Sequence, residues 1–369
     1  MIDKIFNTRA TLPTYEEYIK EISNIWENHW ITSFGPKYKL LESKLQKFLE
    51  IEYVSLLMNG HSALELAIQA IGLSGEVITT PYTFISTTHA IVRNGLTPVY
   101  CDIRGSNFNI DVNKIEYLIN ENTSAIIPVH VYGNICDVYG IKKLADKYKL
   151  KVIYDGAHSF GEKFNGINVS NFGDATIYSF HASKVFNTIE GGCVATQNKN
   201  LKEKIDKLTN FGLNQNNSEL IGMNAKMNEF SAAMGLCNLR NFETTINKRK
   251  YIIERYKRGL DNITSLKFCN EDSRVTSNYS YLPIILESSN LREFLYNELN
   301  RLNIQVLRNF YPIVTEHICY EIRFKKYFLP VAKQLASRVL TLPLYEDLSI
   351  DEVDYIVDTM KRLIYNYNK

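Results

Sequence analysis

Near the middle of the chain the sequence reads Val152-Ile153-Tyr154-Asp155-Gly156-Ala157-His158. Three apolar residues lead to an aspartate, and two small residues then lead to a histidine. A short apolar run of this kind is typical of a strand that is buried on both faces of a sheet. Ligands of open α/β sheets sit beyond the carboxyl ends of such strands. Asp155 can therefore hold a cationic ring nitrogen or a ribose hydroxyl there, or it can simply cap the next helix.

The sequence around this strand alternates between apolar strands and amphipathic helices. We predict helices over residues 38–49, 62–71, 84–92 and 136–148, and strands over 51–57, 76–79, 97–101, 125–129, 151–154 and 175–180. This alternation predicts an α/β fold in which helices cover both faces of a mostly parallel sheet. The buried stripe of the first helix is expected to consist of Leu40, Leu41, Leu45, Phe48 and Leu49.

The pattern changes after residue 180. A long helical stretch is expected from about 227 to 260, and then a smaller α+β unit with a strand over 279–286 and helices near 290–301 and 350–365. No linker composition marks a boundary, so we place one near residue 250, inside the long helix. The prediction is an N-terminal segment with a large domain over 1–250, and a small C-terminal domain over 251–369.

Composition excludes several classes of protein. The 42 basic and 40 acidic residues leave a net charge of +2, which gives no electrostatic case for a nucleic-acid or membrane-surface partner. Neither a membrane span nor, in Met1–Asn7, the apolar core of a signal peptide is expected. The six cysteines are too far apart for a CxxC clamp, so we predict no metal site and a cytoplasmic protein with reduced thiols.

A second polar cluster follows the strand over 175–180. It reads Ser179-Phe180-His181-Ala182-Ser183-Lys184, and Glu190-Gly191-Gly192 comes soon after. A lysine at the end of a buried strand is a candidate nucleophile, because a desolvated amine attacks a carbonyl group more readily than a solvated ammonium does. The alternative is an ordinary surface lysine. Gly191 and Gly192 favour the first interpretation, because glycines let another stretch of backbone approach closely.

Two further clusters suggest ligand contacts. Asn59-Gly60-His61-Ser62 opens a helix, whose first N–H groups and dipole can bind an anion. It matches neither nucleotide-binding glycine fingerprint, and a plain helix cap is the alternative. Pro81-Tyr82-Thr83-Phe84 offers an aromatic plate or core packing. Taken together, a phosphate cradle, an aromatic plate, an acid and a lysine meet the needs of pyridoxal 5'-phosphate (PLP).

The chain resembles the DegT/DnrJ/EryC1/StrS family of sugar aminotransferases, which are PLP enzymes of the type I aspartate-aminotransferase fold. The resemblance extends over nearly the whole chain. Its landmarks are residues 75–84, 128–133, 155–158, 179–184, 190–192, 222–229 and 340–344. So many landmarks in one order make chance agreement implausible.

The resemblance implies roles around the cofactor ring. Lys184 would bind the cofactor aldehyde covalently and later move the proton between cofactor and sugar carbons. Asp155 would keep the ring nitrogen protonated, and His158 would lie near the ring hydroxyl. Phe84 would stack on the ring face.

It also implies roles around the phosphate. Gly60, His61 and Ser179 would bind the phosphate of the cofactor. His61 stands where the family often has Thr or Ser, so Ser62 is an alternative source of a hydroxyl group. Asn224 would reach the cofactor phosphate of a partner subunit, and the active unit would therefore be a homodimer.

The implied reaction is amino transfer, because Lys184 stands where dehydratase members of the family carry His. L-glutamate would convert PLP to pyridoxamine phosphate, which would then aminate a keto sugar linked to a nucleotide diphosphate. The segment from 75 to 192 most resembles enzymes acting on dTDP-linked keto-6-deoxyhexoses. Amination at C3 would give Fuc3N or Qui3N, and amination at C4 would give 4-amino-4,6-dideoxyglucose, in either case for surface polysaccharides such as the O-antigen of lipopolysaccharide.

Several alternatives stay open at this point. The sequence does not decide whether C3 or C4 is aminated. It also leaves open a UDP- or GDP-linked sugar as the substrate. Lys226, Arg308 and Tyr311 are candidates for binding the sugar nucleotide, or else are a surface charge or packed aromatic. A PLP-binding regulator without turnover is a second hypothesis. A nicotinamide-dependent sugar epimerase is a third, but the glycine fingerprint that it needs does not follow the first strand.

Overall fold

The computed structural model describes residues 4–324, 326–367 and 369 of the chain. Met1–Asp3, which belong to the N-terminal segment considered above for a signal peptide, lie outside the described residues. Within the described ranges, no helix combines the length and the apolar composition that a membrane crossing needs.

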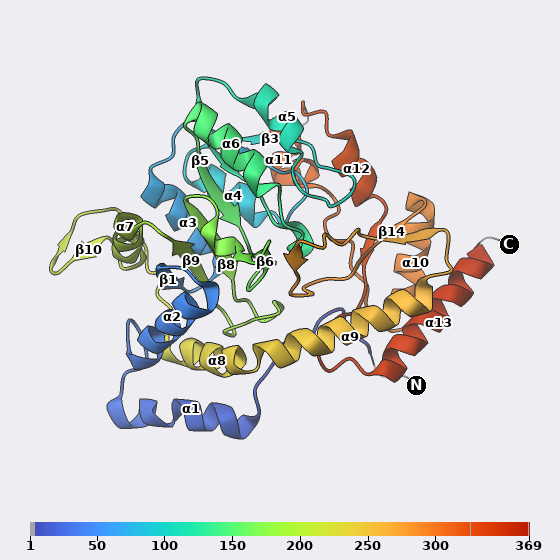
Figure 1. The fold of residues 1–369 in the computed structure, drawn as a ribbon, viewed down its shortest axis with the longest axis horizontal. Helices are drawn as coiled ribbons and strands as arrows, with labels where there is room; N and C mark the ends of the chain where they lie inside the picture. Colours follow the sequence, from blue (N-terminus) through green and yellow to red (C-terminus); the bar gives the residue numbers. More distant parts are fainter. Residues whose placement is uncertain (1–3, 325, 368) are drawn as a thin grey trace.

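A seven-stranded sheet forms the centre of the larger unit (Figure 1), with the strand order β1-β9-β8-β5-β4-β2-β3. The strands are β1 (Tyr53–Leu57), β2 (Glu76–Thr79), β3 (Thr97–Tyr100), β4 (Thr123–Ile127), β5 (Lys151–Asp155), β8 (Ala175–Ser179) and β9 (Gly192–Thr196). Strands β3, β2, β4, β5 and β8 pair in parallel, whereas β9 is antiparallel to both β8 and β1. The prediction of a mostly parallel sheet is confirmed, although β9 was not predicted.

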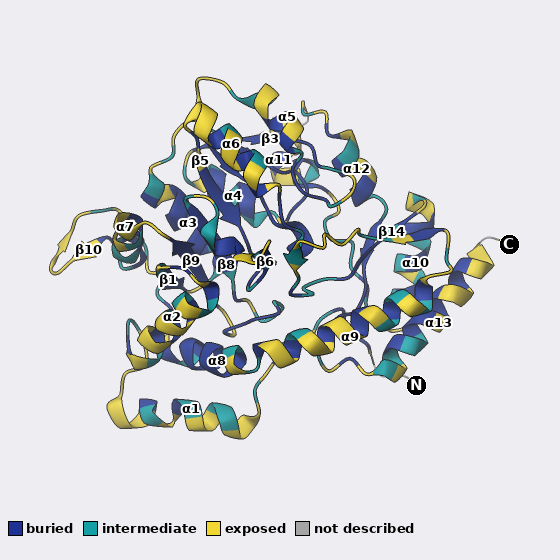
Figure 2. Cartoon of the chain, viewed as in Figure 1, coloured by how far each residue is buried: buried dark blue, intermediate teal, exposed yellow. Residues whose placement is uncertain are grey.

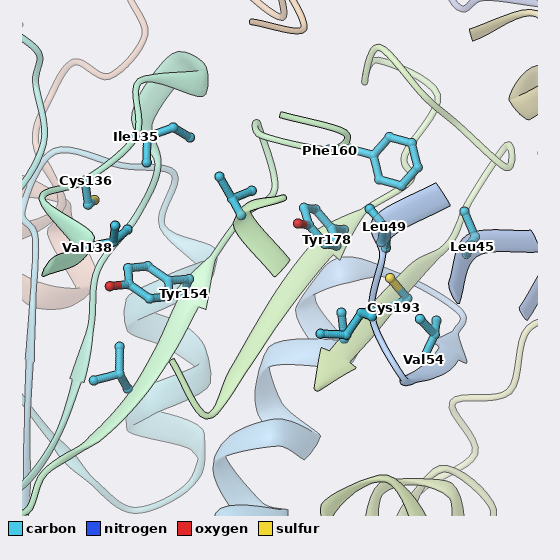
Figure 3. Close-up of a cluster of buried hydrophobic side chains, with 14 of the residues drawn as sticks. Leu45, Leu49, Val54, Ile135, Cys136, Val138, Tyr154, Phe160, Tyr178 and Cys193 are labelled. Atoms are coloured by element: carbon cyan, nitrogen blue, oxygen red, sulfur yellow. The ribbon is translucent and has the colours of Figure 1, made fainter. Parts of the chain in front are cut away.

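Helices cover both faces of this sheet. On one face lie α3 (Gly60–Ile71), α4 (Ser86–Arg93) and α7 (Lys199–Thr209); on the other lie α2 (Pro36–Leu49), α5 (Val112–Ile115), α6 (Val138–Tyr148) and α8 (Glu229–Arg240). Successive side chains along a strand point to opposite faces of the sheet. Ile153 and Ile177 pack beneath α3, whereas Tyr154 and Tyr178 pack with Cys193 on the α2 side (Figure 3). Burial of these apolar surfaces is the main force that holds the layers together.

A second hydrophobic core forms the smaller unit. It is built from α9 (Phe242–Leu260), α10 (Ser289–Arg301), α13 (Ile350–Tyr367) and an antiparallel sheet of β12 (Leu266–Phe268), β14 (Pro283–Leu286) and β15 (Val339–Thr341). Helices α9 and α13 lie side by side with exposed outer faces (Figures 1 and 2). The N-terminal Ile5 packs into this same core. The boundary that we predict near residue 250 falls inside α9.

Short elements complete the chain. They are α1 (Tyr15–Asn28), the sheet of β13 (Val275–Thr276), β6 (Lys163–Phe164) and β7 (Ile167–Asn168), the hairpin of β10 (Leu213–Asn214) and β11 (Asn217–Ser218), α11 (Ile318–Phe324), α12 (Pro330–Ala336), and 3₁₀ turns at Glu116–Leu118, Val131–Gly133, Val169–Asn171 and Val314–Glu316. The β10–β11 hairpin projects from the body at the left of Figure 1. All six cysteines are free thiols, and four of them are buried.

Three predictions of local structure were wrong. Leu40 is exposed, because the buried stripe of α2 follows Leu41, Leu45 and Leu49 at intervals of four residues. The helix predicted over 227–260 is two helices, α8 and α9, which are separated at Asn241. The strand predicted over 279–286 begins only at residue 283, and residues 278–280 instead form hydrogen bonds with the side chain of Arg249 and the loop that carries His158.

The first turn of α2 is capped by a side chain from α8. Gly35 occupies the N-cap position and has no side chain to offer. The buried carboxylate of Glu229 accepts hydrogen bonds from the N–H groups of Lys37 and Tyr38, each at 2.8 Å. A Cβ atom on Gly35 would come within 2.5 Å of the Glu229 carboxyl carbon, so a larger residue there would displace the capping carboxylate. The contact ties α2 to α8 on one face of the sheet.

We expect Glu229→Ala to lower the free energy of unfolding by about 2 kcal/mol, because it leaves two N–H donors, one buried and one partly buried, without an acceptor. Urea unfolding of the cofactor-free protein measures this change. Glu243→Ala is the matched control, because Glu243 lies exposed in the first turn of α9. Equal unfolding midpoints for the two variants would contradict the capping role.

Candidate active site

A cavity of about 420 Å³ lies where several sheet strands end. Strand β9 is antiparallel to both β1 and β8, so β1 and β8 run in the same direction as β5, and their carboxyl ends meet at one edge. The volume suits a cofactor-sized ligand. Of the residues predicted to bind the cofactor, Gly60, His61, Phe84, Asp155, His158, Ser179 and Lys184 line this cavity.

The N-terminus of α3 forms a tightly fitted part of the cavity wall. Gly60 is the first residue of the helix, and a Cβ atom there would come within 2.7 Å of the Cβ of Ser179. A Cβ atom on Gly192 would likewise come within 2.6 Å of the backbone of Asn59. These glycines therefore bring unpaired helix N–H groups beside the Ser179 side chain. Such an arrangement binds a phosphate group well.

The imidazole of His61 lies between Ser86 of the neighbouring helix α4 and Glu65, one turn further along its own helix. Its Nδ1 lies 2.8 Å from the Ser86 hydroxyl, and its Nε2 lies 3.5 Å from a carboxylate oxygen of Glu65. The backbone N–H of His61 therefore remains the group that suits a phosphate. Ser62 is buried, donates its N–H to the side chain of Asn59 at 2.8 Å, and does not belong to the cavity lining.

Asp155 lies at the end of β5 and is 5% exposed. Its carboxylate accepts hydrogen bonds from the Thr87 hydroxyl at 2.7 Å and from the Ala157 N–H at 3.1 Å. Burial raises the pKa of this carboxyl, although both hydrogen bonds oppose the shift. A buried carboxylate in this position is stabilised when a cationic group, such as a protonated ring nitrogen, comes next to it.

His158 is held in one tautomer. Its Nδ1 accepts a hydrogen bond from the Tyr132 N–H at 3.1 Å, which leaves Nε2 as the nitrogen that carries the hydrogen. Burial lowers the pKa of His158 well below its usual value, and the nearby charge of Lys184 adds to this shift. The imidazole is thus a neutral hydrogen-bond donor on the cavity wall.

Lys184 lies in the turn that follows β8. Its N–H donates to the carbonyl of His181 at 2.9 Å, and the next two residues, Val185 and Phe186, are buried in the core. The Nζ atom lies 3.4 Å from the hydroxyl of Tyr281. No carboxylate oxygen of the described residues lies within 4.0 Å of it, so the amine is not engaged in an ion pair.

Several cavity residues were not predicted from the sequence. Tyr281, Asn309 and Phe310 come from the second half of the chain, and Phe310 lies parallel to His158 with ring centroids 5.8 Å apart. The sequence around these three residues shows no pattern that predicts a binding site. Thr87, which binds Asp155, could have been found, because it lies one turn beyond Phe84 in the predicted helix. Phe84 itself is 62% exposed on the cavity wall.

The residues predicted to bind the sugar nucleotide do not line the cavity itself, but Arg308 and Tyr311 directly flank Asn309 and Phe310, which do. Lys226 donates to the side chain of Asn210 at 2.8 Å, and Arg308 forms an ion pair with Glu293 at 3.0 Å. The ring of Tyr311 lies 4.4 Å from the guanidinium of Arg292. Lys226, Arg308, Tyr311 and the exposed Asn224 do not belong to the cavity lining of the described chain, so their predicted roles stay predictions.

The cavity fits PLP in its arrangement of charge and polarity. Helix N–H groups and a serine hydroxyl lie at one end, and a buried carboxylate and a neutral imidazole donor lie along the wall. A lysine amine without an ion-pair partner reaches the same space. One cavity therefore contains a suitable group for each predicted contact with PLP. These contacts are with the phosphate, the ring nitrogen, the ring hydroxyl and the aldehyde.

Comparison with known protein families places most of the chain in one family. The family model of the DegT/DnrJ/EryC1/StrS aminotransferase family matches residues 14–361. The chain is 43% identical over 362 residues to a dTDP-4-amino-4,6-dideoxy-D-glucose transaminase of Shigella dysenteriae, covering 97% of this chain and 99% of that protein. It is 31% identical over 356 residues to a dTDP-3-amino-3,6-dideoxy-alpha-D-galactopyranose transaminase of Aneurinibacillus thermoaerophilus, covering 95% and 96%.

Solved structures share the fold. A crystal structure of DesI in the presence of its TDP-sugar product superimposes with a TM-score of 0.94 at 28% identity, over 98% of this chain and 93% of that one. The PLP form of a putative sugar aminotransferase from Streptococcus pneumoniae superimposes with a TM-score of 0.89 at 26% identity, over 97% and 98%. The predicted α/β architecture of the PLP transferases is thereby confirmed.

A buried histidine beneath this site predicts how stability depends on pH. His130 accepts the Cys136 N–H at Nδ1 and stacks on Tyr154 at 4.9 Å, and burial lowers its pKa to about 3. The unfolded chain takes up a proton near pH 6.5 but the folded chain does not, so the stability that His130 contributes is lost as pH falls below that value. Between pH 7 and 5, the wild type should lose roughly 2 kcal/mol more than His130→Asn, as measured by urea unfolding.

The matched control is His29→Asn, because His29 is exposed and asparagine tolerates its left-handed backbone conformation. This variant should keep the pH dependence of the wild type. A pH dependence in His130→Asn as steep as in the wild type would contradict the buried neutral state of His130.

A second prediction concerns Asp155. We expect Asp155→Ala to raise the dissociation constant for PLP about tenfold or more, because the ring nitrogen loses its charged hydrogen-bond partner. Fluorescence titration of the cofactor-free protein measures this constant. Asp146→Ala, which removes an exposed surface carboxylate, is the control. Equal constants in both variants would mean that another group holds the ring.

Proposed function

The chain belongs to the DegT/DnrJ/EryC1/StrS aminotransferase family, and we propose that it transfers the amino group of L-glutamate to C4 of a dTDP-linked 4-keto-6-deoxyglucose. The product would be dTDP-4-amino-4,6-dideoxyglucose. The observation that carries this proposal is the 43% identity over 97% of the chain to a relative whose name states that sugar. The relative named for a 3-amino sugar is only 31% identical, so C4 is the better choice between the two carbons.

The enzyme is a PLP-dependent aminotransferase, and different residues would bind different parts of the cofactor. When bound, PLP supplies an aldehyde for covalent attachment of amines and a ring that accepts electrons from the adjacent carbon. Gly60 and His61 would bind the phosphate through their N–H groups, and Ser179 through its hydroxyl. The buried carboxylate of Asp155 would keep the ring nitrogen protonated.

Three side chains would act around the ring. Neutral His158 would donate a hydrogen bond from Nε2 to the ring hydroxyl, and Phe84 would cover one ring face. Lys184 would bind the aldehyde and, once displaced by the incoming amine, act as the base that takes a proton from one carbon and returns it to another. One base can serve both positions because its side chain is long and forms no ion pair with the described residues.

We also propose a homodimer in the cytoplasm. Asn224 is exposed, lies outside the cavity of its own chain and bridges to Asn210 beside the projecting β10–β11 hairpin, which suits a contact with the cofactor phosphate of a partner subunit. Lys226, Arg308 and Tyr311 remain our candidates for binding the sugar nucleotide. The free cysteines suit a reducing compartment. The amino sugar would serve surface polysaccharides such as the O-antigen of lipopolysaccharide.

The reverse half-reaction tests the carbon that is aminated. The PLP form is mixed separately with dTDP-4-amino-4,6-dideoxyglucose and with dTDP-linked 3-amino-3,6-dideoxyhexoses, and the absorbance of the cofactor is followed. We expect only the 4-amino sugar to convert PLP to pyridoxamine phosphate. Conversion by a 3-amino sugar alone would move the reaction to C3, and conversion by neither would overturn the dTDP-sugar assignment.

Lys184→Ala is the control for this assay. It should bind PLP but show no conversion with either sugar, because no other amine at the site can move the proton. Turnover by this variant at the wild-type rate would overturn the role of Lys184. L-glutamate, added to the wild type without any sugar, should convert the cofactor in the same assay.

A further inference from the structure

A tyrosine from the smaller unit reaches the reacting lysine. Tyr281 lies just before β14, and its hydroxyl is 3.4 Å from the Nζ of Lys184, 97 residues earlier in the chain. The Lys184 Nζ also lies 5.9 Å from the centroid of the Tyr281 ring. Within the described chain, Lys184 is the one hydrogen-bond partner of this hydroxyl. Hydrogen bonds at catalytic groups are often long before substrate binds, so the distance suits a working contact.

The segment that carries Tyr281 is fixed by buried polar groups. The Asn278 amide donates to the carbonyls of His158 and Phe160 at 2.9 and 3.0 Å. The Ser280 hydroxyl donates to the same His158 carbonyl at 2.7 Å. Residues 278 and 280 therefore attach the smaller unit directly to the loop that carries His158.

A buried arginine completes this support. The guanidinium of Arg249, on α9, donates to the carbonyls of Tyr279 and Ser280 at 2.9 and 2.8 Å. Burial lowers the pKa of Arg249 to about 10, because the guanidinium is removed from water. Buried polar networks that satisfy their partners make a segment rigid. Tyr281 consequently meets Lys184 from a fixed direction, with its ring edge-on to His158 at 4.8 Å.

We propose that Tyr281 is a further catalytic residue, whose hydroxyl holds the Lys184 amine in line with the cavity for attack on the cofactor aldehyde and for proton transfer. The proposal rests on the amino transfer proposed above. In the first step, the amine adds to the aldehyde carbon and water leaves; in the second, the amine takes a proton from one carbon and returns it to another. A phenol suits both steps, because it orients the amine without fixing it as an ammonium ion in the way that a carboxylate would.

The test compares Tyr281→Phe with Tyr279→Phe. The first change removes the hydroxyl and keeps the ring against His158. The second removes a hydroxyl from the same segment, and that hydroxyl has no hydrogen-bond partner among the described residues. The two readouts are the rate at which added PLP becomes covalently linked to Lys184, trapped with borohydride and measured by mass spectrometry, and the rate of exchange of the α-hydrogen of L-glutamate with solvent deuterium.

We expect Tyr281→Phe to slow both rates on the order of tenfold, the effect of losing one hydrogen bond to the reacting group. The affinity for the PLP phosphate and the KM for glutamate should stay within about twofold of the wild type, because Tyr281 touches neither the phosphate cradle nor Asp155. Tyr279→Phe should match the wild type throughout.

A covalent linkage rate in Tyr281→Phe equal to that of the wild type would overturn the proposal. This rate needs neither glutamate nor a sugar, so it decides the role of Tyr281 even if the proposed substrates are wrong. Failure of the proposed function itself would show separately, as an absence of hydrogen exchange in the wild type. Slower linkage in Tyr281→Phe, with normal linkage in Tyr279→Phe, supports the role.

Discussion

The close approach of Gly60 and Gly192 to neighbouring backbone is the constraint on which the rest of the site depends. Residue 192 pairs with both Leu57 and Ser179, so its strand lies between the two strands whose ends form the phosphate cradle. Any side chain at residue 60 would meet Ser179, and any at residue 192 would meet Asn59. The sheet and helix α3 can only come together in this way when both positions lack a Cβ atom.

Long-range hydrogen bonds to backbone groups connect the layers around this centre. Glu229 caps the helix that begins at Pro36, and Asn278 binds the carbonyls of the loop that carries His158. In each case one buried polar side chain satisfies backbone groups that would otherwise be left without partners. These contacts also fix direction, which apolar packing alone does less well. The loop that carries His158 is thereby held by Asn278, which itself takes no part in the proposed chemistry.

Whether a residue's role depends on local sequence or on distant contacts explains what could be predicted from the sequence. Asp155 and Lys184 were predictable, because a strand end and the residues just after it form a local pattern, and the order of strands and helices follows from apolar periodicity. Tyr281 was not, because its contact with Lys184 joins residues 97 apart, and nothing in its own neighbourhood indicates a site. Strand β9 and the break at Asn241 were missed for a related reason, since tertiary pairing and packing decide them.

Burial gives each titratable group beside the expected ring a different task. Burial lowers the pKa of His158, and its Nδ1 already accepts a hydrogen bond, so this side chain suits a hydrogen-bond donor better than a base. Asp155 is buried and forms no ion pair within 4.0 Å among the described residues, so it favours a ligand that brings a positive charge. Lys184 faces a phenol instead of a carboxylate, so its amine can lose and regain a proton without breaking an ion pair. The surroundings of His158 and Asp155 therefore leave Lys184 as the group that moves the proton between carbons in the proposed reaction.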